Sequence, residues 1–166
     1  TYSYIYTGSQ LTQMKVGGNT LTFTYDASGV PLTISTGTST YYYATNLQGD
    51  VVAILRKTTT GMTPIGTYTY DAWGNCTVTG TASIMQLNPL RYRGYVYDQE
   101  TKLYYLQSRY YDPEVGRFIN ADGLVTTGQG FTGNNMFAYC GNNPVNRVDP
   151  TGEAWFLPII VVVAAA

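Results

Sequence analysis

The chain contains no histidine among its 166 residues. Histidine is the commonest general base and metal ligand, so its absence excludes Ser-His and Cys-His arrangements and most zinc sites. Charged side chains are also scarce, at 11% of the sequence, and the net charge is only −1. Because nucleic-acid binding draws on clustered Lys and Arg, this composition argues against a phosphate-binding surface. We therefore expect no cofactor, no metal and no nucleic-acid partner.

Cysteine is nearly absent as well, with one residue at Cys76 and another at Cys140. Two thiols cannot hold a metal alone, and a count of two is weak evidence for an oxidising compartment. The sequence favours two separate small apolar thiols but leaves open whether they pair. Thr1 begins within a strand-like pattern without a signal peptide, so we expect the chain to be a piece of a longer protein.

Threonine, tyrosine and glycine dominate, and they alternate with a period of two. In the segment 20–25, Leu21, Phe23 and Tyr25 fall on one face and threonines on the other. This period predicts a strand with one packed and one wetted face, and it excludes a helix there. Similar runs separated by short polar turns extend from residue 1 to about 70.

An internal repeat marks the turns. The sequence TYDASG at 24–29 matches TYDAWG at 69–74 in five of six positions, with an offset of 45 residues. In each copy a tyrosine ends a strand, an aspartate caps the turn and a glycine accepts a positive φ, which is the chemistry of short hairpin loops. With two looser echoes farther on, the residues predicted to have this structural role are Tyr25, Asp26, Gly29, Tyr70, Asp71, Gly74, Tyr97, Asp98, Tyr111, Asp112 and Gly116.

The densest stretch is 91–121, RYRGYVYDQETKLYYLQSRYYDPEVGRFINA. We read its segment 103–106, LYYL, as a strand between turns that open at Asp98 and Asp112. Pro113 presets φ and Gly116 closes the second turn. The stretch therefore predicts consecutive hairpins joined by tyrosines.

These motifs resemble the carboxy-terminal end of a YD-repeat protein of the bacterial Rhs family. The resemblance rests on the two repeats, on the core signature LRYRGYVYDQETKLYYLQSRYYDPEVGRFINAD and on NNMFAYCGNNPVNRVDPTG. It implies an all-β ribbon of antiparallel hairpins that forms part of a curved shell and ends in a core plug. It also implies YD repeats at 1–90, the Rhs-associated core at 91–152 and a linker or toxin segment from 153 to 166.

The function implied by the resemblance is encapsulation and delivery of a C-terminal toxin against bacteria or host cells. The implied partners are an upstream shell and a downstream toxin domain of the same parent chain, with immunity or secretion-system partners, in a secreted or cell-surface setting. A surface adhesin or carbohydrate-binding wall protein is the alternative, since rows of tyrosines can stack on sugars. Because the first strand lacks a neighbour, we expect poor solubility or self-association.

The resemblance further implies self-cleavage by an aspartate pair, Asp122 and Asp149, helped by Arg117. One carboxyl would keep its proton while the other activates water. The sequence departs from that pattern because Asp122 lacks a following proline, the aspartates are 27 residues apart, and Glu153 replaces a leucine. The alternative is that both aspartates cap turns, with 149–152 as a type I turn. If cleavage occurs, we expect it between Gly152 and Ala154.

The composition changes abruptly after Glu153 to WFLPIIVVVAAA at 155–166. These twelve residues are too few to span a bilayer, which takes about 20. Two alternatives remain open. The segment is either the start of a membrane-contacting or translocation element, or a strand that packs into the shell wall.

Overall fold

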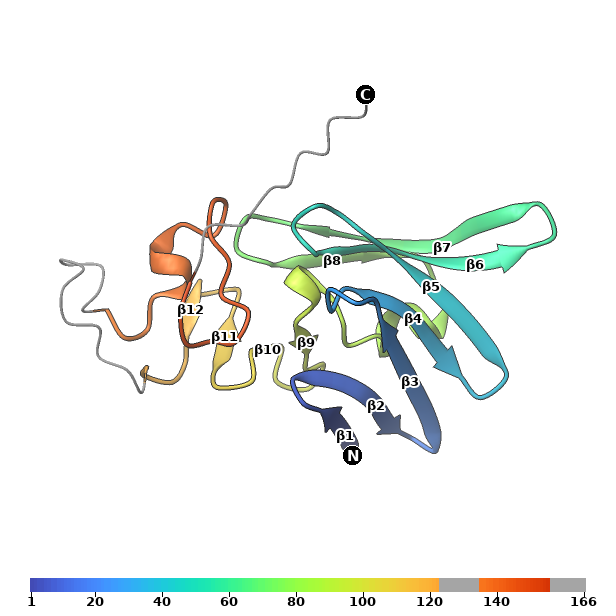
Figure 1. Ribbon diagram of the computed structural model, residues 1–166, viewed down its shortest axis with the longest axis horizontal. Helices are drawn as coiled ribbons and strands as arrows, with labels where there is room; N and C mark the ends of the chain where they lie inside the picture. The colour runs from blue at the N-terminus through green and yellow to red at the C-terminus, as the bar shows by residue number, and fades with distance from the viewer. Residues whose placement is uncertain (123–134, 156–166) are drawn as a thin grey trace, which may run out of the picture.

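The computed structural model describes residues 1–122 and 135–155, and most of its regular structure is antiparallel β-sheet (Figure 1). The first sheet has eight strands whose order in space is their order in the sequence. Each strand pairs with its chain neighbours, as expected for a ribbon of hairpins. The strands are β1 (Tyr2–Thr7), β2 (Gln10–Val16), β3 (Asn19–Tyr25), β4 (Pro31–Thr36), β5 (Ser39–Thr45), β6 (Val51–Thr58), β7 (Gly61–Tyr70) and β8 (Cys76–Thr79).

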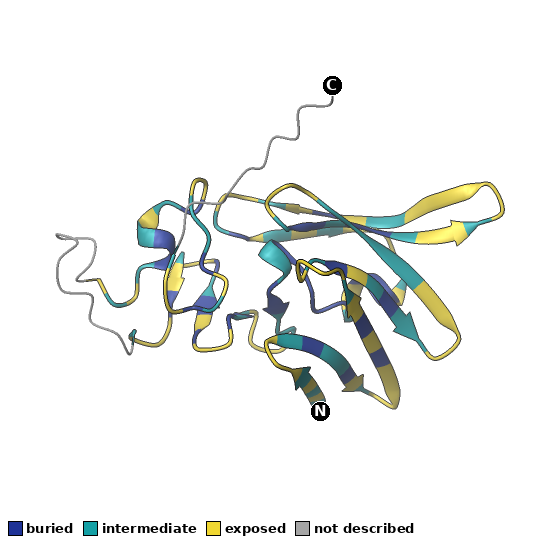
Figure 2. Ribbon diagram, in the orientation of Figure 1, coloured by how far each residue is buried: buried dark blue, intermediate teal, exposed yellow. Residues whose placement is uncertain are grey.

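Alternation of side chains gives this sheet its packed face, as β3 illustrates. Leu21 and Phe23 are buried at 0% and 3% exposure, while the threonines beside them are exposed. Buried and exposed colours accordingly alternate along the ribbons of the first sheet (Figure 2). Leu21 faces Met14 across β2, and Phe23 faces Ile34 across β4. The period-two prediction for this segment is confirmed.

The second sheet also follows chain order, from β9 to β12. Its strands are short, and Tyr104 of β10 pairs with Tyr97 on one side and Tyr111 on the other. The strands are β9 (Val96–Tyr97), β10 (Tyr104–Tyr105), β11 (Tyr110–Asp112) and β12 (Arg117–Phe118). The predicted strand at LYYL is therefore confirmed at its two tyrosines.

Short helical turns connect and follow the sheets. The α-helix α1 (Ser83–Leu87) buries Ile84 and Met85 against the first sheet, and it was not anticipated from the sequence. The 3-10 turns are η1 (Tyr92–Gly94) and η2 (Tyr139–Asn142). The proposed domain division at 90/91 stays a prediction, although β8 ends at Thr79 and β9 begins at Val96.

Two hydrophobic cores lie one under each sheet. The first is mainly aliphatic, with Leu11, Leu21, Ile34 and Ile54 among its members. The second is built largely of aromatic rings: Tyr92, Tyr95, Tyr104, Tyr111, Phe118 and Tyr139. Cys140 is buried in the second core, Cys76 is half-buried at the start of β8, and both thiols are free.

Two further observations concern the residues that the structure describes. None of their helices has the length and apolar character needed to cross a membrane. No group of three or more cysteine, aspartate or glutamate side chains among them is arranged to hold a metal ion. The hydrophobic segment after Trp155 lies outside the described residues.

Candidate functional site

The two repeats found in the sequence form the same turn. Asp26 Oδ1 accepts the N–H groups of Ser28 and Val30 at 2.8 and 2.9 Å. Asp71 Oδ1 accepts the N–H groups two and four residues on, from Trp73 and Asn75, at 2.8 and 3.0 Å. The carboxylate therefore holds each loop from inside, as an Asx-type cap does.

A third copy of this turn has asparagine in place of aspartate. Asn46 Oδ1 accepts the N–H groups of Gln48 and Asp50 at 3.0 and 2.9 Å. The backbone bond from Gly49 N–H to the Asn46 carbonyl repeats the one from Gly74 to Asp71. An amide oxygen accepts hydrogen bonds as a carboxylate oxygen does, so asparagine can form the same turn. The repeat defined by a Tyr-Asp pair does not include this copy, because its residues are Thr45 and Asn46.

The Asp71 turn is inserted into the aromatic core of the second sheet. Three consecutive backbone carbonyls each accept one tyrosine hydroxyl, at distances of 2.7 to 2.9 Å. The pairs are Tyr92 with Ala72, Tyr111 with Trp73 and Tyr104 with Gly74. Gly74 has φ +92°, and a Cβ placed there would lie 2.7 Å from the Tyr92 ring. Only glycine fits this contact without a shift of the ring.

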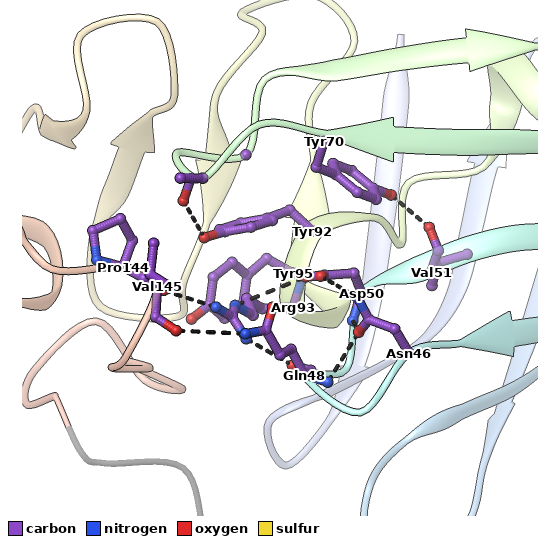
Figure 3. Close-up of polar contacts among 12 residues, drawn as sticks. Asn46, Gln48, Asp50, Val51, Tyr70, Tyr92, Arg93, Tyr95, Pro144 and Val145 are labelled. Atoms are coloured by element: carbon purple, nitrogen blue, oxygen red, sulfur yellow. Dashed lines mark hydrogen bonds and ion pairs between the residues drawn. The ribbon is translucent and has the colours of Figure 1, made fainter.

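The Asn46 turn is held by Arg93, which lies in η1, just before the second sheet in the chain (Figure 3). Arg93 donates from its backbone N–H to Asp50 Oδ1 at 2.9 Å, and from Nη1 to the Gln48 carbonyl at 3.2 Å. Its Nη2 reaches the carbonyl of Pro144 at 2.8 Å. The same guanidinium therefore connects the first sheet, η1 and the segment after η2. The Asn46 turn and the Asp71 turn are therefore both hydrogen-bonded to residues of η1 or the second sheet.

The two aspartates implied in self-cleavage meet at Arg109, in the connection between β10 and β11. Arg109 Nη1 lies 3.1 Å from Asp122 Oδ2, and Nη2 lies 3.5 Å from Asp149 Oδ2. Nη1 also donates to the Met136 carbonyl at 3.0 Å, and Nε donates to the Gly152 carbonyl. We call Arg109, Asp122 and Asp149 the carboxylate clamp.

Arg109 and Asp149 of the clamp are buried, Asp122 is half-buried, and the arginine rests on an aromatic ring. Asp149 is 2% exposed, and the Arg109 guanidinium carbon lies 3.6 Å from the centre of the Phe118 ring. Burial raises the pKa of Asp149 above its ordinary value, and the charge of Arg109 offsets only part of that rise. Burial also lowers the pKa of Arg109, although the negative charges of both aspartates act to raise it.

The loop 149–152 is closed by the side chain of Asp149. The carboxylate Oδ1 of Asp149 accepts the Gly152 N–H at 2.8 Å, while the Asp149 carbonyl accepts the Tyr95 hydroxyl at 2.8 Å. Ser108 donates its hydroxyl to the Thr151 carbonyl at 2.7 Å. A side chain therefore replaces the backbone carbonyl as the acceptor that closes the loop.

Arg117 lies outside the clamp. It is exposed on β12, where its partners are Asp112 across the hairpin and Ala138 in an isolated bridge. The structure therefore brings together two of the three residues named from the sequence and places Arg109 where Arg117 was expected. Arg109 sits in a tyrosine-rich turn with no motif that distinguishes it from the other arginines of the segment.

Comparison with known proteins assigns the family. The family model described as the teneurin YD-shell matches residues 2–145, which is most of the chain. The chain belongs to the YD-shell family. This membership confirms the prediction of a YD-repeat protein of the Rhs type.

Named toxins are among the relatives of this YD-shell chain. It is 42% identical over 134 residues to the tRNA3(Ser)-specific nuclease WapA of Bacillus spizizenii, covering 81% of the chain and 6% of that protein. It is 42% identical over 87 residues to the double-stranded DNA deaminase toxin A of Burkholderia cenocepacia, covering 51% of the chain and 6% of that protein. The chain thus spans about 6% of the length of these relatives.

A solved structure shares the fold. The TcdB2-TccC3 crystal structure superposes with a TM-score of 0.68 at 22% identity, over 86% of this chain and 7% of the other. The expected all-β ribbon is confirmed, and the short helix α1 is an addition to it.

Proposed function

We propose that this chain is the closing end of a β-shell that encloses a toxin domain of its own parent polypeptide. One observation carries the proposal. The Asp71 turn of the first sheet is inserted into the tyrosine core under the second sheet, so the hairpin sheet and the closing end pack as a single structure. Membership of the YD-shell family and the toxins among its relatives support it.

The open first sheet supports the same proposal. β1 pairs with β2 alone in the described part of the chain, so its outer edge can accept the last strand of a preceding hairpin. The partners would then be an upstream shell and a downstream toxin domain, with secretion-system and immunity proteins acting on the whole. Such a protein would work outside the producing cell or at its surface.

Protease protection tests the enclosure. We call the contact between the Asp71 turn and the tyrosine core of the second sheet the junction. In the parent protein, the domain after residue 166 should resist protease for as long as this junction is closed. Gly74→Ala would push against Tyr92 and open it, so that domain should be digested faster. Gly18→Ala is the matched control, because Gly18 also has a positive φ, +82°, but nothing lies within 4 Å of the added Cβ. Equal digestion of wild type and both variants would contradict enclosure by this end.

Self-cleavage is a second proposed activity, and the carboxylate clamp is the observation that favours it. Asp122 and Asp149 stand 27 residues apart in sequence, yet both contact Arg109. The raised pKa of Asp149 suits a carboxyl that keeps its proton, which makes Asp149 the acid and Asp122 the base that activates water. We assign the orienting role to Arg109 in place of Arg117.

Mass measurement of the parent chain tests this activity. Cleavage between Gly152 and Ala154 should release a downstream fragment, and Asp149→Asn or Asp122→Asn should abolish its release. Arg109→Gln should slow cleavage strongly, whereas Arg117→Gln should not, because Arg117 is exposed on β12. An intact wild-type chain would exclude self-cleavage without affecting the proposed enclosure.

The adhesin alternative depends on tyrosine rings that are open to a glycan. In the second core those rings are buried, and Tyr92, Tyr104 and Tyr111 spend their hydroxyls on backbone carbonyls. The sequence downstream of residue 166 would discriminate, since a toxin module favours delivery and a wall anchor favours adhesion.

A further inference from the structure

Tyr105 and Tyr110 differ from the tyrosines around them. They face each other across β10 and β11, with ring centroids 5.1 Å apart and ring planes inclined at 42°. Neither hydroxyl has a hydrogen-bond partner in the part of the chain that the structure describes. Tyr110 is 41% exposed and Tyr105 is half-buried, so oxidants in solvent can reach the pair.

Their immediate neighbours on the same strands are protected. Tyr104 and Tyr111 are fully buried, and each donates its hydroxyl to a carbonyl of the Asp71 turn. Burial raises the pKa of both phenols well above the ordinary value of 10.0. Oxidation of a phenol to a neutral radical releases the phenolic proton, and a buried hydroxyl bonded to a carbonyl has no acceptor for it.

We propose that Tyr105 and Tyr110 are a site of intramolecular dityrosine cross-linking, driven by a peroxide acting through a haem peroxidase. Each phenol gives up one electron and its phenolic proton, and the two radicals join by a carbon–carbon bond between ring carbons ortho to the oxygens. The hydrogen on each of those carbons then moves to the adjacent oxygen and restores the ring. In sum, two hydrogen atoms leave the tyrosines and reduce one hydrogen peroxide to two waters.

The position of this bond gives it a structural effect. It would span the turn that carries Ser108 and Arg109, which is closed by the backbone bond from Leu106 N–H to the Arg109 carbonyl at 2.9 Å. Ser108 and Arg109 both donate hydrogen bonds to the 149–152 loop. A cross-link here would therefore fix the base of the carboxylate clamp covalently, whether or not the chain cleaves itself.

Other tyrosine pairs compete for the same chemistry. Tyr6 approaches Tyr105 at 6.0 Å, but the rings meet edge to face at 69°. Tyr2 and Tyr4 lie stacked at 6.2 Å on one strand. The cross-strand pair is closer than both, and its two residues sit directly opposite one another.

Peptide mapping after treatment with hydrogen peroxide and a haem peroxidase tests the proposal. Trypsin cuts after Lys102, Arg109 and Arg117, so Tyr105 and Tyr110 fall in adjacent peptides, LYYLQSR and YYDPEVGR. We expect these peptides joined, two hydrogen masses below their sum, in a chain of monomeric size. Tyr110→Phe should lose this product, and Tyr42→Phe should retain it, because Tyr42 lies on β5 of the first sheet and is not part of the pair.

The remaining outcomes overturn the proposal. Persistence of the joined peptides in Tyr110→Phe would assign the bond to Tyr111 instead of Tyr110. A product that contains the peptide of residues 1–15 would assign it to a tyrosine of β1. Cross-links found only in dimers, or none at all, would remove the site. Circular dichroism of Tyr110→Phe should match wild type, since its hydroxyl makes no hydrogen bond to the residues that the structure describes. A matching spectrum would show that loss of product is not loss of fold.

Discussion

Tyr104 donates its hydroxyl to the backbone carbonyl of Gly74, 30 residues earlier in the chain, at 2.9 Å. Both residues are buried, and the bond joins the second sheet to a turn of the first. With the bonds from Tyr92 and Tyr111 it leaves the turn with three consecutive occupied carbonyls. The junction is therefore lined by aromatic rings but held by hydrogen bonds from their hydroxyls to backbone carbonyls.

Removal of one of these hydroxyls should weaken the junction. Tyr104→Phe leaves the Gly74 carbonyl buried without its donor, which costs about 1–3 kcal/mol of unfolding free energy. Denaturant unfolding followed by tyrosine fluorescence measures it. Tyr42→Phe is the control and should stay within about 0.5 kcal/mol of wild type. A Tyr104→Phe variant as stable as this control would show that the bond contributes nothing net.

The Asp71 turn should respond to acid. Burial alone raises the pKa of Asp71, but hydrogen bonds from the Asn75 side chain and from backbone N–H groups outweigh it and hold the pKa below its ordinary 3.8. A lowered folded-state pKa means that the stabilisation is complete above the ordinary value and is lost as the pH falls through the folded one. Unfolding midpoints measured on a descending pH series should show this loss.

Asn46 indicates which substitution removes the acid response without removing the turn. Asp71→Asn should keep most of the stability at neutral pH, because an amide oxygen can accept the same N–H groups. It should also reduce the loss of stability that the wild type shows as the pH falls. Asp71→Ala should lose about 0.5–1 kcal/mol at neutral pH, since the loop N–H groups lose their acceptor but remain partly open to water. Equal losses in the two variants would contradict this account of the turn.

Arg109 and Arg117 form a natural pair for testing the clamp. Arg109→Met leaves two aspartates without their cation, one of them buried, and should cost about 3 kcal/mol or more. Arg117→Met changes an exposed side chain on β12 and should cost about 0.5 kcal/mol or less. Denaturant unfolding of both variants at neutral pH compares them. Similar losses would mean that the clamp does not stabilise the fold.

The pH dependence of the clamp has the opposite sign to that of Asp71. Because the folded-state pKa of Asp149 is raised, stability should fall as the pH rises from the ordinary 3.8 toward the folded value. Arg109→Met removes the charge that limits this rise, so the decline should continue to a higher pH. Unfolding midpoints between about pH 4 and 7 measure it. A window that moves to lower pH in the variant would contradict the assigned cause.

The sequence predicts local structure well here because the local rules are simple. Alternation fixes the faces of β3, and the Asp26 and Asp71 carboxylates make the turns that their motif predicts. Contacts between distant segments are different. Nothing near Arg109 in the sequence indicates that it lies between Asp122 and Asp149, because its position depends on how β10, β11 and the 149–152 loop pack.

The free edge of β1 should make the isolated chain associate. β1 carries no charged side chain and pairs with β2 alone among the described strands, so its outer backbone groups can bind another strand. Sedimentation velocity should show a weight-average mass that rises with concentration. Ile5→Lys places a charge on this edge and should reduce association, because a second strand would have to bury it. Leu32→Lys is the matched control, since Leu32 is similarly exposed, at 46% against 41%, but lies on the interior strand β4. A chain that remains monomeric at high concentration, or one that Leu32→Lys disperses equally well, would place the interaction elsewhere than at β1.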